Sequence, residues 1–393
     1  MNPITNRGPA EKIIFVPFIH AFGGVERLIL ALSRFLREHD MAHTVACFSE
    51  TIDFAAYAEW PITVRELAPR RNPVSEGWAL NRYMRTAHAG GSPPPLLFDL
   101  KGAFYAGMFP APGYHLHLTD PPSLLPTEVS GFALSLRRAY PSFRKEVRPG
   151  LAKMIRGEIV HRINRRGASS ALSVIVMTNA IADELRMLYS VEAKIIRPGV
   201  RMPSSPLLSH AQAVDNVRML SVCRLEPNKR LDWILNALAG LESSVVPLSK
   251  KIDWTLDLVG DGSQREELQN LAGQRGIAER VVFHGRVSDA RVEELFADAG
   301  LFLMPAVQGY GLPALEALAR GVPVILHRES GVSEILKGTP WAEIIEDGTE
   351  DLASAINTMV NCLCSDELEK SPVPAFPTET DWAREICTLC RWL

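Results

Sequence analysis

QGYGLPALEALARGVPVI, residues 308–325, combines a glycine-rich turn, a short helix and a buried strand. Gly309 and Gly311 carry no Cβ, so a ligand can approach the backbone closely there. A turn that leads into a helix also offers backbone N–H groups to an anion. Glu316 follows about one helical turn later, where its carboxylate can accept hydrogen bonds from hydroxyl groups. The stretch favours a nucleotide-sugar pocket, with an ordinary helix-to-strand connection as the alternative.

The length and composition set the broad class. A chain of 393 residues suffices for two domains of ordinary size. Its 47% hydrophobic and 22% charged residues are typical of a globular protein with a large core. The formal net charge of −3 gives no overall basic field for nucleic acid. Without a long apolar run or a signal peptide, the sequence predicts a cytoplasmic protein.

The cysteines raise the question of a metal site. In a chain with no signal peptide we expect reduced thiols. The last four form a C-x-C and a C-x-x-C, which is compatible with zinc, but their apolar neighbours favour packing. We therefore expect no metal. The six cysteines are Cys47, Cys223, Cys362, Cys364, Cys387 and Cys390.

Short apolar strands alternate with amphipathic helices, which predicts parallel sheets built from βαβ units. One series of strands covers 12–19, 43–49, 96–100, 113–122 and 173–179, and a second covers 218–225, 254–260, 280–285 and 301–306. A Pro/Ser-rich stretch separates them. We predict two doubly wound, Rossmann-like domains facing across a cleft. The acceptor-side domain is expected over 1–200 and the nucleotide-sugar-binding domain over 217–375. A linker at 201–216 joins them, and a helix within 376–393 is expected to pack back toward the first domain.

Polar residues follow several of these strands, where open α/β sheets bind ligands. Arg224 and Lys229 lie five positions apart and suit a diphosphate, although a solvated basic turn has the same spacing. Gly23 and Gly24 open the first helix and can face an anion or merely allow tight packing. His117 can position a sugar hydroxyl or exchange a proton, or it can be structural. Weaker signals are the glycine turn at Gly260 and the backbone of Arg286 and Val287, which could meet a nucleobase.

Five motifs follow one another along the chain. They are GGVERL at 23–28, RLEPNK at 224–229, VGDG, FHGRV, and the opening stretch with GVSEIL after it. In order and spacing they resemble the family-4 retaining glycosyltransferases of GT-B fold, most firmly over 218–340. The resemblance implies a nucleotide-sugar donor, held mainly by the second domain, and neither a metal nor a cofactor.

The same resemblance implies individual roles. Glu316 would hold the ribose hydroxyls, and His117 would lie near the reacting sugar. The diphosphate would be neutralised by Arg224 and Lys229, helped by Gly23 and Gly24. The remaining donor-binding positions would be Gly260, Arg286, Val287, Gly309, Tyr310, Gly311 and Leu312.

Gln308 departs from the family pattern. The family has a glutamate at this place, eight positions before the glutamate matched by Glu316, and its carboxylate contacts donor-sugar hydroxyls. Glutamine keeps the hydrogen-bonding capacity and loses the charge. If that charge assists an oxocarbenium-like transition state, its loss could cost several kcal/mol. Retained activity with another donor and weak activity both remain open.

A basic stretch with interleaved apolar residues covers 137–166. Such a surface could rest on anionic lipid headgroups or contact an anionic acceptor, and a solvated helix face is the plain alternative. We expect peripheral association with the inner face of a membrane. The residues of this predicted membrane or acceptor patch are Arg137, Arg138, Arg144, Lys145, Arg148, Lys153 and Arg156.

The sequence thus predicts a retaining, metal-independent hexosyltransferase-type enzyme. It would move a sugar from a nucleoside diphosphate to a hydroxyl of a lipid-linked or polysaccharide acceptor, as in surface polysaccharide or lipopolysaccharide biosynthesis. The alternatives are another reaction of the same fold, such as epimerisation or phosphorolysis, and a catalytically weak or silent sugar-nucleotide-binding protein.

Overall fold

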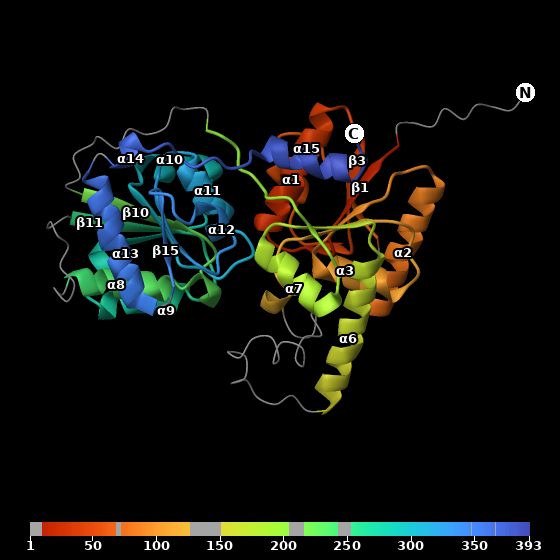
Figure 1. Ribbon diagram of the computed structural model, residues 1–393, viewed down its shortest axis with the longest axis horizontal. Coiled ribbons are helices and arrows are strands. Elements are labelled where there is room, and N and C mark those ends of the chain that lie inside the picture. The colour runs from red at the N-terminus through yellow and green to blue at the C-terminus, as the bar shows by residue number, and fades with distance from the viewer. Residues whose placement is uncertain are drawn as a thin grey trace, which may run out of the picture. The chain divides into compact units, whose positions relative to one another are not determined.

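The chain forms two compact units, shown in the computed structural model of Figure 1. The first comprises Met1–Pro198 with Glu379–Leu393, and the second Gly199–Thr378. The residues that the structure describes are 10–67, 72–125, 151–203, 216–242, 253–346, 348–365 and 367–393.

The first unit is built on a seven-stranded parallel sheet of order β5-β3-β1-β6-β7-β8-β9. A second, two-stranded parallel sheet pairs β2 with β4. The strands are β1 Lys12–Phe15, β2 Phe18–Ile19, β3 His43–Cys47, β4 Ser49–Glu50, β5 Val64–Glu66, β6 Leu96–Phe98, β7 His115–Leu118, β8 Ser173–Val176 and β9 Lys194–Ile195.

The helices of this unit are amphipathic elements that cover the sheet. In α1 the spacing of Leu28, Leu32 and Phe35 buries one face, as a helical period requires. The α-helices described in this unit are α1 Gly24–Glu38, α2 Pro73–Ala89, α3 Asp99–Met108, α6 Leu151–Ser170, α7 Asn179–Tyr189 and α15 Glu379–Leu389, with short 3₁₀ turns at Phe54–Tyr57 and Pro122–Leu124.

The second unit has a six-stranded parallel sheet of order β12-β11-β10-β13-β14-β15. Its strands are β10 Asn216–Val222, β11 Asp253–Val259, β12 Val281–Gly285, β13 Leu301–Met304, β14 Val324–His327 and β15 Ala342–Ile345. Its described helices are α8 Leu231–Glu242, α9 Arg265–Gln274, α10 Asp289–Asp298, α11 Leu312–Leu318, α12 Ser333–Leu336, α13 Gly348–Leu363 and α14 Glu367–Lys370, with 3₁₀ turns at Pro227–Lys229 (η4) and Ala278–Arg280 (η5).

Two doubly wound parallel sheets confirm the predicted α/β class. The strands β13 and β14 are buried along their whole length, because helices cover both faces of a parallel sheet. Several predicted strands are shorter than expected. Pro17 separates β1 from β2 within 12–19, and the strand predicted at 96–100 ends at Phe98 because Asp99 takes a left-handed backbone conformation, with φ of 65°.

The terminal helix α15 belongs to the first unit, beside α1 (Figure 1). Its Trp382 is fully buried, and Arg34 of α1 forms an ion pair with Glu379 at 2.7 Å. Trp392 donates its indole N–H to the carbonyl of Pro94 at 3.1 Å. The C-terminal segment is therefore part of the core of the first unit.

The two ends of the second unit lie side by side. Val200 and Thr378 form a parallel β-bridge, and the Val200 N–H donates to the carbonyl of Pro377 at 3.2 Å. A Cβ on Gly199 would collide with that same carbonyl oxygen, so the close approach needs glycine at this position.

Candidate active site

The strand order of the second unit reverses between β10 and β13, which are hydrogen-bonded neighbours. In an open α/β sheet, ligands bind beyond the carboxyl ends of the strands at such a switch point. The loop after β10 carries Arg224 and Lys229, and the loop after β13 carries residues 308–312. The fold therefore gathers the two sequence motifs at one edge of one sheet.

The two loops are joined by a hydrogen bond. Lys229 Nζ donates to Gln308 Oε1 at 2.7 Å, and Asn228 Nδ2 donates to the Val307 carbonyl at 3.0 Å. Arg224 is exposed, whereas Lys229 and Glu316 are half-buried. The helix that carries Glu316, α11, has only 7 residues, so its dipole is small.

Gln308 is held at both ends of its amide. Its Nε2 donates to Ser330 Oγ at 3.0 Å and lies 3.1 Å from Met304 Sδ. Gly311 has φ of 117°, and a Cβ there would lie 2.6 Å from Gln308 Nε2. Both the conformation and the space require glycine at 311. Leu312 begins α11 directly afterwards, and Tyr310 is buried.

The glycine turn 259–262 supports the loop after β10. Gly260 has φ of 124°, and a Cβ on it would collide with the carbonyl oxygen of Cys223. Its N–H donates to the Gly285 carbonyl at 2.8 Å, which ties β11 to the end of β12. Gly260 thus has a structural reason to be glycine. Beyond β12, Arg286 is exposed and Val287 half-buried.

In the first unit the strand order reverses between β1 and β6. Gly23 precedes α1, and its N–H donates to the Glu26 carboxylate at 3.0 Å. A Cβ built on Gly24 would meet no atom within 4 Å. Packing does not require glycine at 24, which leaves the predicted approach of an anion as a reason for it.

The role near the reacting sugar stays a prediction for His117, whose surroundings in the structure are those of a core residue. His117 is within β7, fully buried, and its ring stacks on Phe98 at 5.0 Å and meets Trp382 edge-on at 5.8 Å. Burial lowers the pKa of His117 to about 3, so the ring is neutral. Its partner on the strand, His115, is also buried and hydrogen-bonds Ser173 Oγ at 2.7 Å.

Asp99 is a polar residue at a strand end that the sequence analysis missed. It is half-buried, follows β6 at the switch point, and accepts a hydrogen bond from the Thr119 hydroxyl. Burial raises the pKa of Asp99 to about 7, with the charges of Asp120 and Glu26 acting in the same direction. A non-glycine residue with positive φ at a strand end is a signal of local strain, but the sequence LLFDL does not reveal it.

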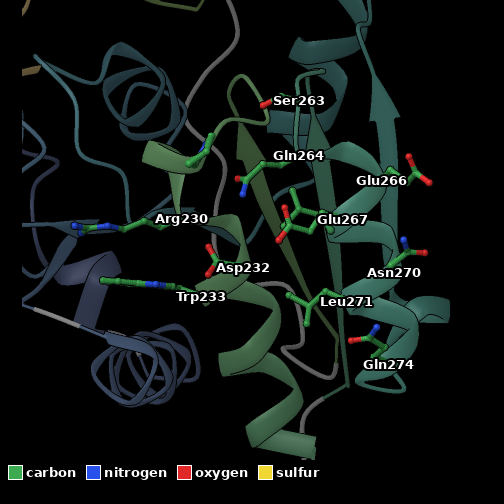
Figure 2. Close-up of a pocket in the computed structure, with 12 residues that line it drawn as sticks. Arg230, Asp232, Trp233, Ser263, Gln264, Glu266, Glu267, Asn270, Leu271 and Gln274 are labelled. Atoms are coloured by element: carbon green, nitrogen blue, oxygen red, sulfur yellow. The ribbon is translucent and has the colours of Figure 1, made fainter. Parts of the chain in front are cut away.

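A groove of about 750 Å³ lies between the start of α8 and the length of α9 (Figure 2). Arg230 and Trp233 lie side by side at its rim, with the guanidinium carbon 4.4 Å from the ring centroid. Asp232, Glu266 and Glu267 also line it. Three carboxylates make this groove unsuitable for a diphosphate.

Other predicted residues fall elsewhere. Lys153 and Arg156 lie on α6. Five residues of the basic patch lie outside the described part of the chain, namely Arg137, Arg138, Arg144, Lys145 and Arg148. Within the described ranges, no group of three or more His, Cys, Asp or Glu side chains could hold a metal ion.

Comparison with known proteins shows which family and fold this chain is similar to. Residues 209–370 match the family model described as glycosyl transferases group 1. The chain is 35% identical over 159 residues to a GDP-mannose-dependent alpha-(1-6)-phosphatidylinositol monomannoside mannosyltransferase of Mycolicibacterium smegmatis, which covers 38% of this chain and 39% of that protein. The chain spans 39% to 48% of the length of the first three curated relatives that it matches.

Two solved structures share the fold over nearly the whole chain. A sucrose-phosphate synthase from Thermosynechococcus elongatus has a TM-score of 0.71 at 16% identity, covering 97% of this chain and 98% of its own. Anabaena HepE in complex with UDP-glucose has a TM-score of 0.65 at 18% identity, covering 97% of each chain.

These findings define the class. The chain has the GT-B fold of two Rossmann-like units, and residues 209–370, which lie in its second unit, match the group 1 glycosyl transferases. The resemblance to family-4 glycosyltransferases is confirmed.

Gly311 and Gly24, each predicted from sequence to bind the donor, should respond differently to alanine. Gly311→Ala forces a side chain into a left-handed conformation beside Gln308, and should lower the free energy of unfolding by about 1–3 kcal/mol. Gly24→Ala meets open space at a helix start and should not lower it. Urea unfolding of both variants measures the difference, and equal losses would contradict this account of the two positions.

Asp99 should make stability depend on pH. Between its ordinary pKa of 3.8 and about 7, the folded protein retains a proton that the unfolded chain has released, so stability falls as pH rises through this window. Asp99→Asn does not titrate, so its stability relative to the wild type should rise by about 4 kcal/mol between pH 4 and pH 8. Thermal unfolding across this range tests it; parallel curves would show that Asp99 titrates normally.

Proposed function

We propose that this protein is a retaining glycosyltransferase that moves a sugar from a nucleoside diphosphate to a hydroxyl group without a metal ion. The observation that carries the proposal is the hydrogen bond between Lys229 and Gln308, in the loop just before α11, at the switch point of the second unit. Arg224 on the same loop as Lys229 would add a second cation. Such fixed cations can neutralise the diphosphate as it leaves, which is the task a divalent ion performs elsewhere.

In this proposal the acceptor oxygen forms a bond to the anomeric carbon as the bond from that carbon to the diphosphate breaks, on the same face of the sugar. Glu316 binds donor hydroxyls. The donor bases considered first are guanine and uracil, since one relative is described as GDP-mannose-dependent and one structural neighbour holds UDP-glucose.

The first experiment is thermal stabilisation of the pure protein by UDP-glucose and GDP-mannose. A true donor raises the melting temperature by mass action. The donor that stabilises is then incubated with dodecyl glycosides as acceptors, and products are separated by mass. Transfer of the sugar to inorganic phosphate would indicate phosphorolysis, and formation of an isomerised sugar nucleotide would indicate epimerisation. Binding without turnover would indicate a silent sugar-nucleotide-binding protein.

Lys229→Ala and Glu316→Ala should each lower the rate of transfer by about 100-fold or more, because each removes a charged contact to the donor. Arg291→Ala is the matched control, since Arg291 is an exposed cation on α10 that pairs with the neighbouring Glu294 at 2.6 Å. The control should keep full activity. Full activity in both of the other variants would refute the proposed site.

We also propose that the acceptor is lipid-linked or a polysaccharide and that the protein works at the inner face of a membrane. Among the described residues, no helix is long and apolar enough to span a bilayer. Helix α6 exposes Leu151, Ile155 and Ile159 at spacings of four residues, and their exposed fractions are 74%, 54% and 53%. Its first turns extend beyond the rest of the unit (Figure 1). An apolar line beside Lys153 and Arg156 is suited to an anionic lipid surface.

The wild type should therefore sediment with vesicles of equal parts phosphatidylglycerol and phosphatidylcholine, and much less with phosphatidylcholine alone. Ile155→Ser with Ile159→Ser should reduce binding to the anionic vesicles by about 10-fold, because two apolar side chains are lost from the contact. Met187→Ser, which changes an exposed apolar residue on α7, is the control. Equal binding by all three proteins would exclude α6 as the contact.

A further inference from the structure

A chain of hydrogen bonds runs from Ser330 to the ammonium of Lys229. Ser330 Oγ accepts from Gln308 Nε2 at 3.0 Å, and Gln308 Oε1 accepts from Lys229 Nζ at 2.7 Å. The three residues come from loops after β14, β13 and β10, which are neighbours in the sheet. Residues far apart in sequence are thus connected at the edge where the diphosphate is proposed to bind.

The orientation of the amide is fixed from both sides. With glutamine at 308, the single proton of the Ser330 hydroxyl goes to the Tyr310 carbonyl at 3.1 Å, and Ser330 accepts from the Gln308 amide. Lys229 can only donate, so it needs the amide oxygen. A glutamine satisfies both partners at once. Ser330 is fully buried, which makes an unmatched partner costly.

The backbone holds the same contact in place. Gln308 and Ser330 form a parallel β-bridge, with Gln308 N–H donating to the Glu329 carbonyl and Gly331 N–H to the Gln308 carbonyl, both at 3.3 Å. The absence of a Cβ at Gly311 leaves the space that the amide nitrogen fills. The position of the Gln308 side chain is therefore set by this unit alone, before any ligand binds.

We propose that Ser330 is a positioning residue that acts through Gln308 to fix the Lys229 ammonium for the diphosphate, so that Gln308 serves the leaving group and not the donor sugar. The inference rests on the proposed function. Both ends of the amide are engaged within the chain, which leaves little capacity for sugar hydroxyls. A neutral amide also holds the lysine without cancelling its charge, whereas a glutamate would form an ion pair with it and compete with the phosphates.

The test is calorimetric titration with UDP, GDP, inorganic pyrophosphate and UMP. Gln308→Glu should fold, because the Ser330 hydroxyl can turn toward the carboxylate while the Tyr310 carbonyl still accepts from Val332 N–H at 2.9 Å. It should weaken binding of pyrophosphate and of the preferred nucleoside diphosphate by about 10- to 100-fold, as expected for a charge-assisted contact. Binding of UMP, which lacks the second phosphate, should change much less.

Ser330→Ala should lower diphosphate affinity in the same sense and by a smaller factor. Ser333→Ala is the matched control, since Ser333 is also buried and loses one hydrogen bond, to the His327 carbonyl at 2.8 Å, without touching Gln308. The control should bind diphosphates as the wild type does. This comparison separates positioning of Lys229 from a general loosening of the unit.

Three results would overturn the proposal. Unchanged diphosphate affinity in Gln308→Glu, with an altered ratio of UDP-glucose to UDP affinity, would place Gln308 on the sugar. Equal diphosphate affinity in Ser330→Ala and Ser333→Ala would show that Ser330 does not position Lys229. Failure of the wild type itself to bind any of the diphosphates would refute the proposed function and this inference with it, and that failure is recognised before any variant is made.

Discussion

The hydrogen bond from the Lys229 ammonium to the Gln308 amide joins two loops that leave neighbouring strands and are 79 residues apart. It can form only because the strand order reverses between β10 and β13, which leaves both loops at the same edge of the sheet. The glycine turn at Gly260 packs against the loop after β10, and the β-bridge between Gln308 and Ser330 holds the loop after β13. These contacts hold the Lys229 ammonium and the Gln308 amide side by side.

The sequence predicts well what depends on local pattern. Alternating apolar segments and helical periods are sufficient for two parallel α/β units, and the glycine motif locates the loop after β13. It predicts poorly what depends on distant partners. His117 follows the strand pattern of an end residue, but it is buried against Phe98 and against Trp382 of α15, far along the chain. The role of Ser330 and the backbone of Asp99 have no readable sequence pattern either.

Gln308 illustrates why a single departure from a family pattern is hard to interpret from sequence. Taken alone, it is a lost charge. In the structure, the Gln308 amide donates to Ser330, whose own hydroxyl donates to the Tyr310 carbonyl. The amide oxygen of Gln308 accepts from Lys229. The surroundings of position 308 therefore match an amide, and the substitution is accommodated by its neighbours.

The β-bridge between Val200 and Thr378 has a consequence for how the chain is organised. Because residues 199 and 378 are adjacent, the second unit leaves and rejoins the first at a single place, in the manner of an inserted domain. A domain whose two ends are adjacent can be inserted, exchanged or removed without changing the path of the chain in the domain that contains it. The first unit, which includes the terminal helix α15, is such a containing domain.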